Sequence, residues 1–376
     1  MCFEWAIADE GFVDLFLWIL FAISTTIIAS VLFFYPCLAK WLARRRGPIA
    51  SVVPEEWPTV AILVPVFNEE KFITRKLENI LRIDYPKDKL TCLVIDNGST
   101  DQTAEMVRRY PVTLLQSERG KNNAINAGLA ATDAEIVIVS DVDTTVEPSA
   151  VKEVVGMLHD DIGAVSGLVT LQREKIPYMR SKLRFHVSDW EMRYTEGLID
   201  SACSLDGRFL AFRHSLVPRL PDEAIIDDLE VTFIVRKQGY RCVVSKSTPV
   251  FEGCPETIWA EIVQIRRRVS TTLVTMVHYW TMIGNPRYGF FGAVTQPFRR
   301  AFALTLPAFV LLDLVVLIYK FGLWVLWVAL GGATLLIVLG EVFPFLQFAG
   351  IVLGWVEVML GRVKPGGLWQ RIQRDS

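Results

Sequence analysis

EIVIVSDVD, at residues 135–143, is the stretch that decides the fold, because a short apolar run ends there directly on two aspartates. Its four consecutive β-branched residues are typical of a strand that is buried on both faces, as in a parallel sheet. Runs of the same kind recur along the chain: TVAILVPVF (59–67), LTCLVID (90–96), PVTLLQ (111–116) and GAVSGLVTL (163–171). We therefore expect one sheet between residue 59 and about residue 250.

Helical segments are predicted between these strands, at 68–81, 100–109, 121–131 and 148–159. Strands joined by crossover helices form a mostly parallel sheet with helices on both faces, so the predicted class is α/β. Ligands of such open sheets bind beyond the carboxyl ends of the strands. That rule places the expected site at the loops of Asn68, Asp96 and Asp141.

The region before this sheet contains a strongly apolar segment. Residues 15–35 carry no charge and are long enough for a helix to cross the roughly 30 Å hydrocarbon core. A retained membrane anchor is expected rather than a cleaved signal peptide, because the segment is long and its basic residues follow it, at Lys40 and 44–46. The same charges place the N-terminus outside and the residues after Lys40 in the cytoplasm.

The end of the chain is again apolar. Segments 301–319 and 321–339 are each long enough to span, and 342–360 is a weaker third candidate that contains Glu357 and several glycines. Two spans would leave the basic tail in the cytoplasm and three would place it outside. We expect the third segment to lie in the bilayer or to re-enter it, with Arg299 and Arg300 as a cytoplasmic flank of the first span.

The predicted organisation follows from these segments: an anchor at 1–46, a linker at 47–58, a cytoplasmic α/β domain at 59–254, interfacial amphipathic helices at 255–300 and a membrane region with a basic tail at 301–376. The 52% content of hydrophobic residues agrees with a membrane component. The formal net charge of −2 argues against nucleic acid as the partner. Six scattered cysteines without a C-x-x-C pair argue against a disulfide framework or a structural zinc site.

Asp141 and Asp143 are the candidate metal ligands. Residues i and i+2 of an extended segment point to the same side, so the two carboxylates can converge on one cation. Mg²⁺ and Mn²⁺ prefer such oxygen ligands and can neutralise a diphosphate leaving group. Acidic turns after strands are also common, so the pair alone is a weak signal.

Asp96, Lys121 and the acidic cluster 227–230 are further candidates. Asp96 either completes the turn of VIDNGSTD or accepts hydrogen bonds from a base or ribose. Lys121, near a helix start, either binds phosphate or is solvated. In the cluster, mutual repulsion predicts a raised pKa. One of its carboxylates could act as a general base, although acidic capping of a helix explains the same residues.

Arginines follow Gln264 in QIRRRV, on a predicted helix. The guanidinium of Arg267 suits a diphosphate, although juxtamembrane arginines more often bind anionic lipid head groups. Trp259 and Trp280 fit a helix that lies in the membrane interface. No G-x-S-x-G, H-E-x-x-H, P-loop or Rossmann glycine pattern occurs in the sequence.

Taken in order, these motifs resemble the inverting family 2 glycosyltransferases, the group that contains cellulose, chitin and hyaluronan synthases and ceramide glucosyltransferase. The resemblance runs from about residue 60 to residue 269. It implies a GT-A fold, a nucleotide-sugar donor (a UDP-sugar by expectation), a Mg²⁺ or Mn²⁺ ion and transfer with inversion at the anomeric carbon.

The resemblance also implies roles for the residues that bind the donor. The opening VPVFNEE, with Pro65, Asn68 and Glu69, is similar to the first donor loop. VIDNGSTD, RGKNNAINAG and SDVD are similar to the motifs that follow it. They imply that Asp96 contacts the nucleotide, that Lys121 reaches the diphosphate, and that Asp143 ligates the metal with Asp141 beside the nucleotide.

The later motifs concern the acceptor and the base. DGRFLAFR, with Gly207, is similar to the acceptor-side segment, and IIDDLEVTFIVRKQGYR to the stretch that carries the catalytic base. By this resemblance Asp228 is the base and Asp227 lies on the acceptor side. Gln264 and Arg267 match the donor-binding part of the Q-x-x-R-W motif.

Two departures from the family pattern affect the expected acceptor. Asp227 stands where the family usually has glutamate, which is a mild change. Arg268 replaces the tryptophan that lies beneath the acceptor sugar in the polymerases, so a membrane lipid is favoured over a growing polysaccharide. A processive polysaccharide synthase remains an alternative. A catalytically silent membrane scaffold is a further one, disfavoured by the complete acidic set.

Overall fold

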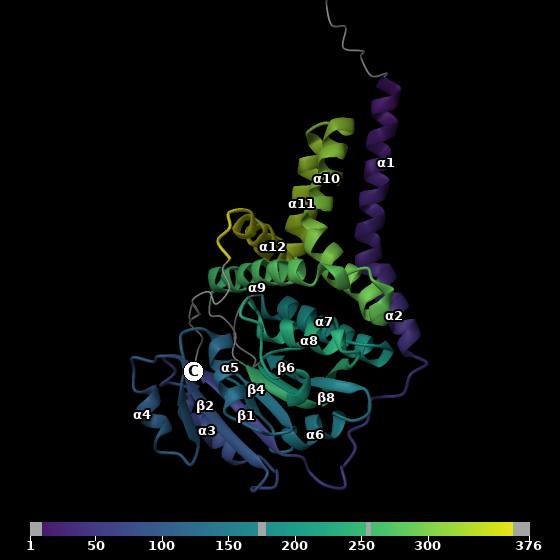
Figure 1. Cartoon of the computed structure of the whole chain (residues 1–376). Helices are drawn as coiled ribbons and strands as arrows, with labels where there is room; N and C mark the ends of the chain where they lie inside the picture. The colour runs from purple at the N-terminus through teal and green to yellow at the C-terminus, as the bar shows by residue number, and fades with distance from the viewer. Residues whose placement is uncertain (1–9, 172–177, 253–256, 364–376) are drawn as a thin grey trace, which may run out of the picture.

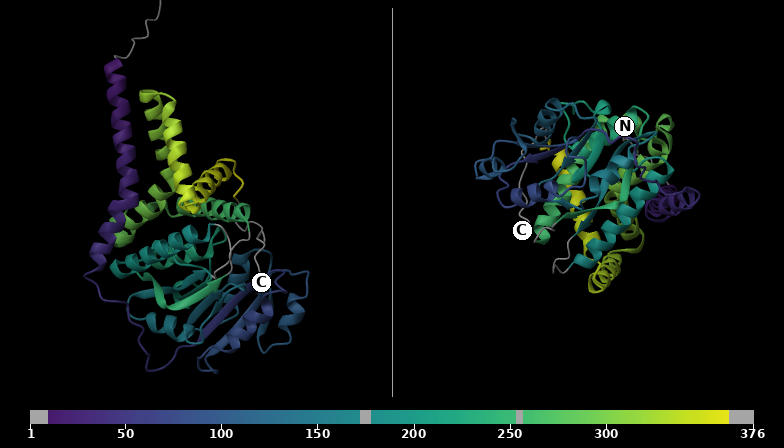
Figure 2. Two further views of the ribbon diagram at one scale, coloured as in Figure 1. Left: turned by 180° about the vertical axis from the view of Figure 1, so that it is seen from behind. Right: turned by 90° about the horizontal axis from the view of Figure 1, so that it is seen from below.

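The structure is a computed structural model that describes residues 10–171, 178–252 and 257–363. An α/β domain occupies one end, and α1 (Glu10–Ala29) and α10 (Ala303–Phe321) project from it side by side (Figure 1). The same separation is visible from behind (Figure 2). The molecule therefore has a compact α/β half and an apolar helical half.

One sheet forms the centre of the domain, and within the described residues its strands lie in the order β3-β2-β1-β4-β7-β6-β8-β5. The bounds are β1 Val60–Val66, β2 Leu90–Asp96, β3 Thr113–Gln116, β4 Ile136–Ser140, β5 Thr145–Val146, β6 Ile162–Leu171, β7 Phe209–Arg213 and β8 Arg241–Glu252. All five predicted strands form. The sheet is parallel from β3 to β4 and mixed beyond, because β7 runs antiparallel to both β4 and β6.

Helices cover both faces of this sheet, as predicted. Their bounds are α3 Ile73–Leu81, α4 Thr103–Val107, α5 Lys121–Ala130, α6 Ala150–Met157, α7 Met179–Ile199 and α8 Asp227–Lys237. Alternate residues of β1 point to opposite faces. Ile62 and Val64 pack with α3 and α6, whereas Ala61 and Leu63 pack with α5 and α8. The core is therefore two apolar layers separated by the sheet.

The first predicted helix begins five residues later than expected, at Ile73. The preceding loop is held by the neighbouring loop instead. The backbone N–H of Asn68 donates to Ser99 Oγ at 3.0 Å, and the side-chain oxygen of Asn68 accepts from the Thr100 N–H at 2.7 Å. Asn68 has a φ of 55°, in the left-handed region that asparagine tolerates, so the chain turns sharply out of β1.

A layer of helices separates the domain from the projecting pair (Figure 1). It contains α2 (Tyr35–Ala43), which continues the α1 rod, and α9 (Ile258–His278). α12 (Phe343–Met359) packs along α9 through its glycines. A methyl group placed on Gly354 would lie 2.7 Å from Val269 Cγ1, so the absence of a side chain sets the distance between these helices.

Polar contacts join α1 and α10. Ser24 Oγ donates to the Phe309 carbonyl at 3.0 Å, and Thr25 Oγ1 donates to Asp313 Oδ2 at 2.9 Å. Asp313 therefore has a structural partner within the helix pair. An ion pair between Asp14 and Lys320 closes the far end of the pair.

Among the described residues, two continuous helices have the length and composition that crossing a bilayer requires, Gly11–Ala43 and Phe291–Phe321. The second begins ten residues before the predicted span. α11 (Trp324–Val338) lies beside α10, and both it and α12 are shorter.

Candidate active site

A cavity of about 1440 Å³ opens at the carboxyl edge of β1 and β4 and extends to the helical layer. The Asp141–Asp143 pair, the Asp227–Asp228 pair and the basic side chains of Lys121 and Arg267 contribute to its wall. The predicted residues that line it are Glu69, Lys121, Asp141, Asp143, Gly207, Asp227, Asp228 and Arg267. Residues that are up to 198 positions apart in the sequence, Glu69 and Arg267, are thus brought to one space.

Lys121 connects the two acidic motifs. It is the first residue of α5, and its Nζ lies 2.9 Å from Asp141 Oδ1 and 3.1 Å from Asp227 Oδ2. Burial by itself lowers the pKa of Lys121, but the two carboxylates raise it by more, so the pKa lies above its ordinary value. The ammonium is therefore charged at neutral pH and holds the centre of the site together.

Hydrogen bonds with the backbone of Arg208 and the side chain of Lys76 hold the turn that carries Asp141 and Asp143. The Asp141 N–H donates to the Arg208 carbonyl at 3.2 Å. Lys76 of α3 is buried, and its Nζ donates to Ser140 Oγ at 2.6 Å and to the Thr144 carbonyl at 3.1 Å. Burial lowers the pKa of Lys76 to about 8, although the nearby aspartates act in the opposite direction.

Lys76 was not among the site residues predicted from the sequence. It lies in an ordinary amphipathic helix, ITRKLENIL, where nothing distinguishes it from a solvated lysine. Only the tertiary structure shows that its ammonium supports both ends of the acidic turn. Its contacts identify it as a support for that turn.

Asp141 and Asp143 offer hard oxygen ligands of the kind that Mg²⁺ and Mn²⁺ prefer. Within the part of the chain that is described, no group of three His, Cys, Asp or Glu side chains could hold a metal ion. A cation at this pair would therefore take its remaining ligands from water and from the phosphates of a bound donor, as Mg²⁺ sites commonly do. The residues present fit an ion that arrives with a diphosphate.

Asp228 lies in the first turn of α8, facing the 206–208 loop. The Gly207 N–H donates to Asp228 Oδ2 at 3.1 Å. A methyl group on Gly207 would lie 3.0 Å from Asp227 Oδ2, so a side chain here would press on the Asp227 carboxylate. Burial, with the charges of Asp227 and Asp206, raises the pKa of Asp228 to about 6. This carboxylate is ionised at neutral pH and is basic enough to accept a proton.

Asp227 pairs with Lys121 and yet has a raised pKa. Burial is the main cause, and the charge of Asp141 adds to it, whereas Lys121 lowers the pKa. Glu230, one turn later on α8, accepts a hydrogen bond from Tyr279 Oη at 2.7 Å. The acidic cluster is therefore divided: Asp227 and Asp228 face the cavity, and Glu230 supports the helical layer.

Asp96, Pro65 and Asn68 are placed in the neighbouring loops and do not line the cavity. Asp96 is buried; its carboxylate accepts hydrogen bonds from the Ser99 N–H at 2.9 Å and from Gln116 Nε2 at 3.1 Å. In this structure it completes its own turn, which is one of the two roles expected for it. The next residue, Asn97, accepts from the Gly120 N–H at 2.9 Å and so ties this turn to the start of α5.

The Q-x-x-R element is split between two environments. Gln264 is buried and is not part of the cavity wall, whereas Arg267 is. Arg266 reaches across to α12, where its Nε lies 3.2 Å from Glu357 Oε1. Glu357, which weakened the prediction of a third span, is therefore an ion-pair partner at the edge of the cavity.

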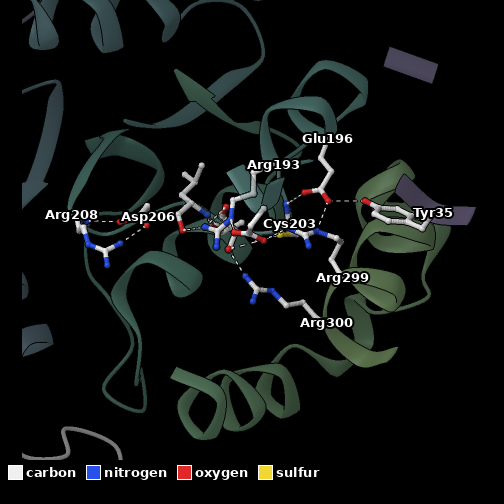
Figure 3. A network of polar contacts seen from close by, with 12 residues as sticks. Tyr35, Arg193, Glu196, Cys203, Asp206, Arg208, Arg299 and Arg300 are labelled. Atoms are coloured by element: carbon white, nitrogen blue, oxygen red, sulfur yellow. Dashed lines mark hydrogen bonds and ion pairs between the residues drawn. The ribbon is translucent and has the colours of Figure 1, made fainter. Parts of the chain in front are cut away.

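A second polar cluster lies beside the cavity, towards the helical layer, and was not predicted (Figure 3). Arg299 lies 2.6 Å from Asp189 Oδ1 and 2.8 Å from Glu196 Oε1, and Arg193 lies 2.9 Å from Asp189 Oδ2. Arg193 and Arg299 lower the pKa of Asp189 against the effect of burial. The i,i+4 spacing of Asp189 and Arg193 could have been found in the sequence. The approach of Arg299, expected only as a flanking charge, could not.

Comparison with known proteins agrees with this arrangement. Residues 61–221 match the glycosyl transferase family 2 model. A probable glycosyltransferase of Bacillus subtilis, YdaM, is 26% identical over 265 residues, which cover 64% of this chain and 63% of that protein. The poly-β-1,6-N-acetyl-D-glucosamine synthase of Staphylococcus aureus is 24% identical over 62% of this chain and 58% of its own length. The chain thus spans less than two thirds of either relative.

The solved structure of the mannosyltransferase PcManGT from Pyrobaculum calidifontis, in complex with GDP-mannose and Mn²⁺, is similar over most of the molecule. The similarity has a TM-score of 0.74 with 25% identity, and it covers 92% of this chain and all of the other. It therefore extends beyond the matched family region into the helical part. With the α/β sheet and the acidic cavity, these findings show a glycosyltransferase with a GT-A-like fold, in which residues 61–221 match the family 2 model.

Proposed function

We propose that this protein is an inverting glycosyltransferase that moves a sugar from a nucleoside diphosphate donor to the hydroxyl group of a membrane-associated acceptor. One observation carries the proposal. Lys121, the Asp141–Asp143 turn and the Asp227–Asp228 pair meet at the wall of one cavity. Charges of this kind stabilise a leaving diphosphate, and a carboxylate beside them can activate a nucleophile.

In the proposed step, Asp228 takes the proton from the acceptor hydroxyl while the oxygen attacks the anomeric carbon from the face opposite the diphosphate. The new carbon–oxygen bond forms, the bond to the phosphate oxygen breaks, and its electron pair leaves with the nucleoside diphosphate. Lys121 and Arg267 offset the charge that develops on that leaving group. A Mg²⁺ or Mn²⁺ ion bound by Asp143 and Asp141 would add further charge neutralisation.

Donor binding is proposed for the loops around this centre. Glu69 lines the cavity, while Pro65, Asn68 and Asp96 shape the loops behind it. The similar mannosyltransferase holds GDP-mannose and Mn²⁺, which makes GDP-sugars candidates beside the expected UDP-sugars. Gln264, which is buried in α9, is proposed to hold the helix that presents Arg267.

We propose that the helices Gly11–Ala43 and Phe291–Phe321 cross the membrane, with α11 as a second C-terminal element and α12 at the interface. The basic residues at 44–46 favour a cytoplasmic position for the domain, with the N-terminus outside. The cavity reaches these helices, and Leu32, Leu304 and Phe348 contribute apolar wall there. A lipid acceptor fits such a wall better than a hydrated glycan does.

The test is nucleotide release from a panel of UDP- and GDP-sugars by the full-length chain in detergent, with Mn²⁺ or Mg²⁺ and with or without membrane lipid extract. We expect one donor to give metal-dependent release that lipid extract stimulates, with the sugar recovered in the organic phase. Absence of release from every donor, together with no binding of UDP or GDP, would overturn the proposal.

A processive polysaccharide synthase is the second candidate, favoured by the similarity to the S. aureus synthase. The products separate the two. A processive enzyme gives radiolabelled chains that lengthen and stay in water, whereas a lipid glycosyltransferase gives one extractable product of fixed size. Arg268 stands at the position of the acceptor-stacking tryptophan, and this favours the single lipid-linked product.

A further inference from the structure

The cavity is continuous from the proposed base to the apolar helices. Its lining includes Asp228 at one end and Val31, Pro307 and Ile351 of the membrane-side helices at the other. The last three side chains come from the α1 rod, α10 and α12, so the apolar end lies among the elements that we place in the bilayer or at its interface. A molecule that reaches Asp228 from this side must carry apolar chains.

Between these two ends the wall is strongly basic, and we call this part the arginine wall. It consists of the arginines Arg193, Arg208, Arg266, Arg267, Arg268, Arg299 and Arg300. Only three acidic side chains of α7, the 206–208 loop and α12 line the same part: Asp189, Asp206 and Glu357. Among the described residues, Arg193 pairs with Asp189, Arg208 with Asp206, Arg266 with Glu357, and Arg299 with both Asp189 and Glu196.

The positive electrostatic potential of the arginine wall acts on His186. Burial, together with the charges of Arg268, Lys182 and Arg208, lowers the pKa of His186 to about 3, although Asp189 acts in the opposite direction. The imidazole is therefore neutral and adds no charge. Several cations thus act on one point of the cavity, where an anion would be stabilised.

Arg300 differs from its neighbour Arg299. Arg299 forms ion pairs with Asp189 and Glu196, whereas Arg300 donates a hydrogen bond to the hydroxyl of Ser204 and interacts with Asp189 only through its charge (Figure 3). Within the described residues, the Nε of Arg300 is buried and meets no acceptor. A buried guanidinium N–H without an acceptor is costly, and an anionic ligand would satisfy it.

Arg300 is also connected to the base through one loop. Its partner Ser204 lies three residues before Gly207, whose N–H holds the Asp228 carboxylate. A group bound at Arg300 is therefore one short loop away from the proposed nucleophile position. A base is needed only if the nucleophile carries a proton, so the anionic group itself is not the attacking group.

We infer that the acceptor is an anionic phospholipid whose head group carries a free hydroxyl. Its phosphodiester binds at Arg300 in the arginine wall, its acyl or alkyl chains lie against Val31 and Pro307, and its hydroxyl reaches Asp228. This inference rests on the proposed function and names its substrate class. The hydroxyl proton passes to Asp228, the oxygen bonds to the anomeric carbon, and the donor's nucleoside diphosphate departs.

The test uses the full-length chain in dodecyl maltoside micelles with three probes: dioleoyl phosphatidylglycerol, dioleoylglycerol and inorganic phosphate. The midpoint of thermal unfolding is measured against probe concentration. We expect phosphatidylglycerol to raise the midpoint, and the two other probes to have little effect at equal concentration. Arg300→Gln should weaken the apparent affinity for phosphatidylglycerol at least tenfold, and Arg300→Lys by less.

Arg287→Gln is the matched control, because Arg287 is exposed beside the same helical layer and outside the cavity lining. It should retain the wild-type response. Equal responses to phosphatidylglycerol and dioleoylglycerol, or equal losses in Arg287→Gln and Arg300→Gln, would overturn the inference. So would a response to inorganic phosphate as strong as that to the lipid, because the site would then be a phosphate site without a lipid.

Val310→Trp keeps the inference testable if Arg300→Gln fails to fold. Val310 lines the apolar end and is 42% exposed, so a larger side chain can be accommodated while it narrows the passage. We expect at least a fivefold loss of phosphatidylglycerol affinity, and an unchanged affinity would contradict the lipid passage. Failure of the proposed function is detected separately, in the nucleotide-release assay. In that case the wild-type protein releases no nucleotide from any sugar donor.

Discussion

At the scale of single residues, the burial of Asp228 favours its proposed role as a base but destabilises the folded protein. Its pKa of about 6 lies above the ordinary value of 3.8, so the folded state binds the proton more tightly than the unfolded chain does. At neutral pH the ionised group therefore destabilises the fold, and this penalty disappears as the pH falls through about 6 towards 3.8. The difference corresponds to on the order of 1–3 kcal/mol.

Asp228→Asn should abolish sugar transfer and raise the free energy of unfolding by about 1–2 kcal/mol. The amide cannot accept the proton, while its oxygen can still accept the hydrogen bond from the Gly207 N–H. Transfer assays and chemical denaturation at pH 7.5 measure the two effects, and UDP or GDP binding should persist. Normal turnover by this variant would remove Asp228 from the role of base.

The pH dependence of the reaction follows from the same group. The carboxylate is present above about pH 6 and is lost below it, so kcat/KM should fall by about tenfold per pH unit on the acid side. Initial rates measured between pH 4.5 and 8 at low donor concentration give this profile. A rate that is flat down to pH 5 would mean that another group, or no group, takes the proton.

Lys121→Met should weaken donor binding more than tenfold and lower the free energy of unfolding by about 1–3 kcal/mol. The substitution leaves Asp141 and Asp227 facing each other without the cation that lies 2.9 and 3.1 Å from them. Titration calorimetry with UDP and GDP and thermal unfolding measure both losses. Lys237→Met, on the exposed end of α8, is the control and should change neither quantity.

At the scale of secondary-structure elements, the strands and helices with a strong local hydrophobic pattern were the ones that could be predicted. β1, β2 and β4 were predictable because consecutive apolar β-branched residues have few alternatives to a buried strand. β7 was hidden in DGRFLAFR, because a strand of five residues with an arginine at its end has a weak pattern of its own. α7 was missed because its 21 residues include many charged side chains, and buried ones such as Lys182 and Glu196 find their ion-pair partners in other elements.

Gly354→Val tests the packing of α12 on α9. A side chain there would press on Val269, with its Cβ 2.7 Å from Cγ1, so we expect a loss of about 1–3 kcal/mol in the free energy of unfolding in detergent. Gly332→Val in α11 is the matched control, because a Cβ at Gly332 meets nothing within 4 Å. Equal stability of the two variants would show that α12 is not packed on α9.

At the scale of the whole molecule, part of the site could be predicted from topology and part could not. Asp141 follows a parallel strand, and the rule that ligands bind at the carboxyl ends of such strands located it correctly at the cavity. No rule of spacing brings Asp227 to Lys121, which lies 106 residues earlier, and only resemblance related the two motifs. Arg299 and Arg300 have the pattern of a membrane flank, and their place in the cavity depends on the fold.

Orientation in the membrane is the property of the whole molecule that remains to be tested. The charges at 44–46 favour the cytoplasm for the α/β domain, and the α10–α11 turn then lies on the opposite side. A cysteine at Leu323, which is 70% exposed in that turn, should react with an impermeant maleimide in intact cells. A cysteine at Gly47, where a Cβ meets nothing within 4 Å, should react only after the membrane is permeabilised. The parent chain, with its native cysteines, gives the background. The reverse pattern of labelling would place the catalytic domain outside, and both the anchor's orientation and the proposed access of cytoplasmic donors would then be wrong.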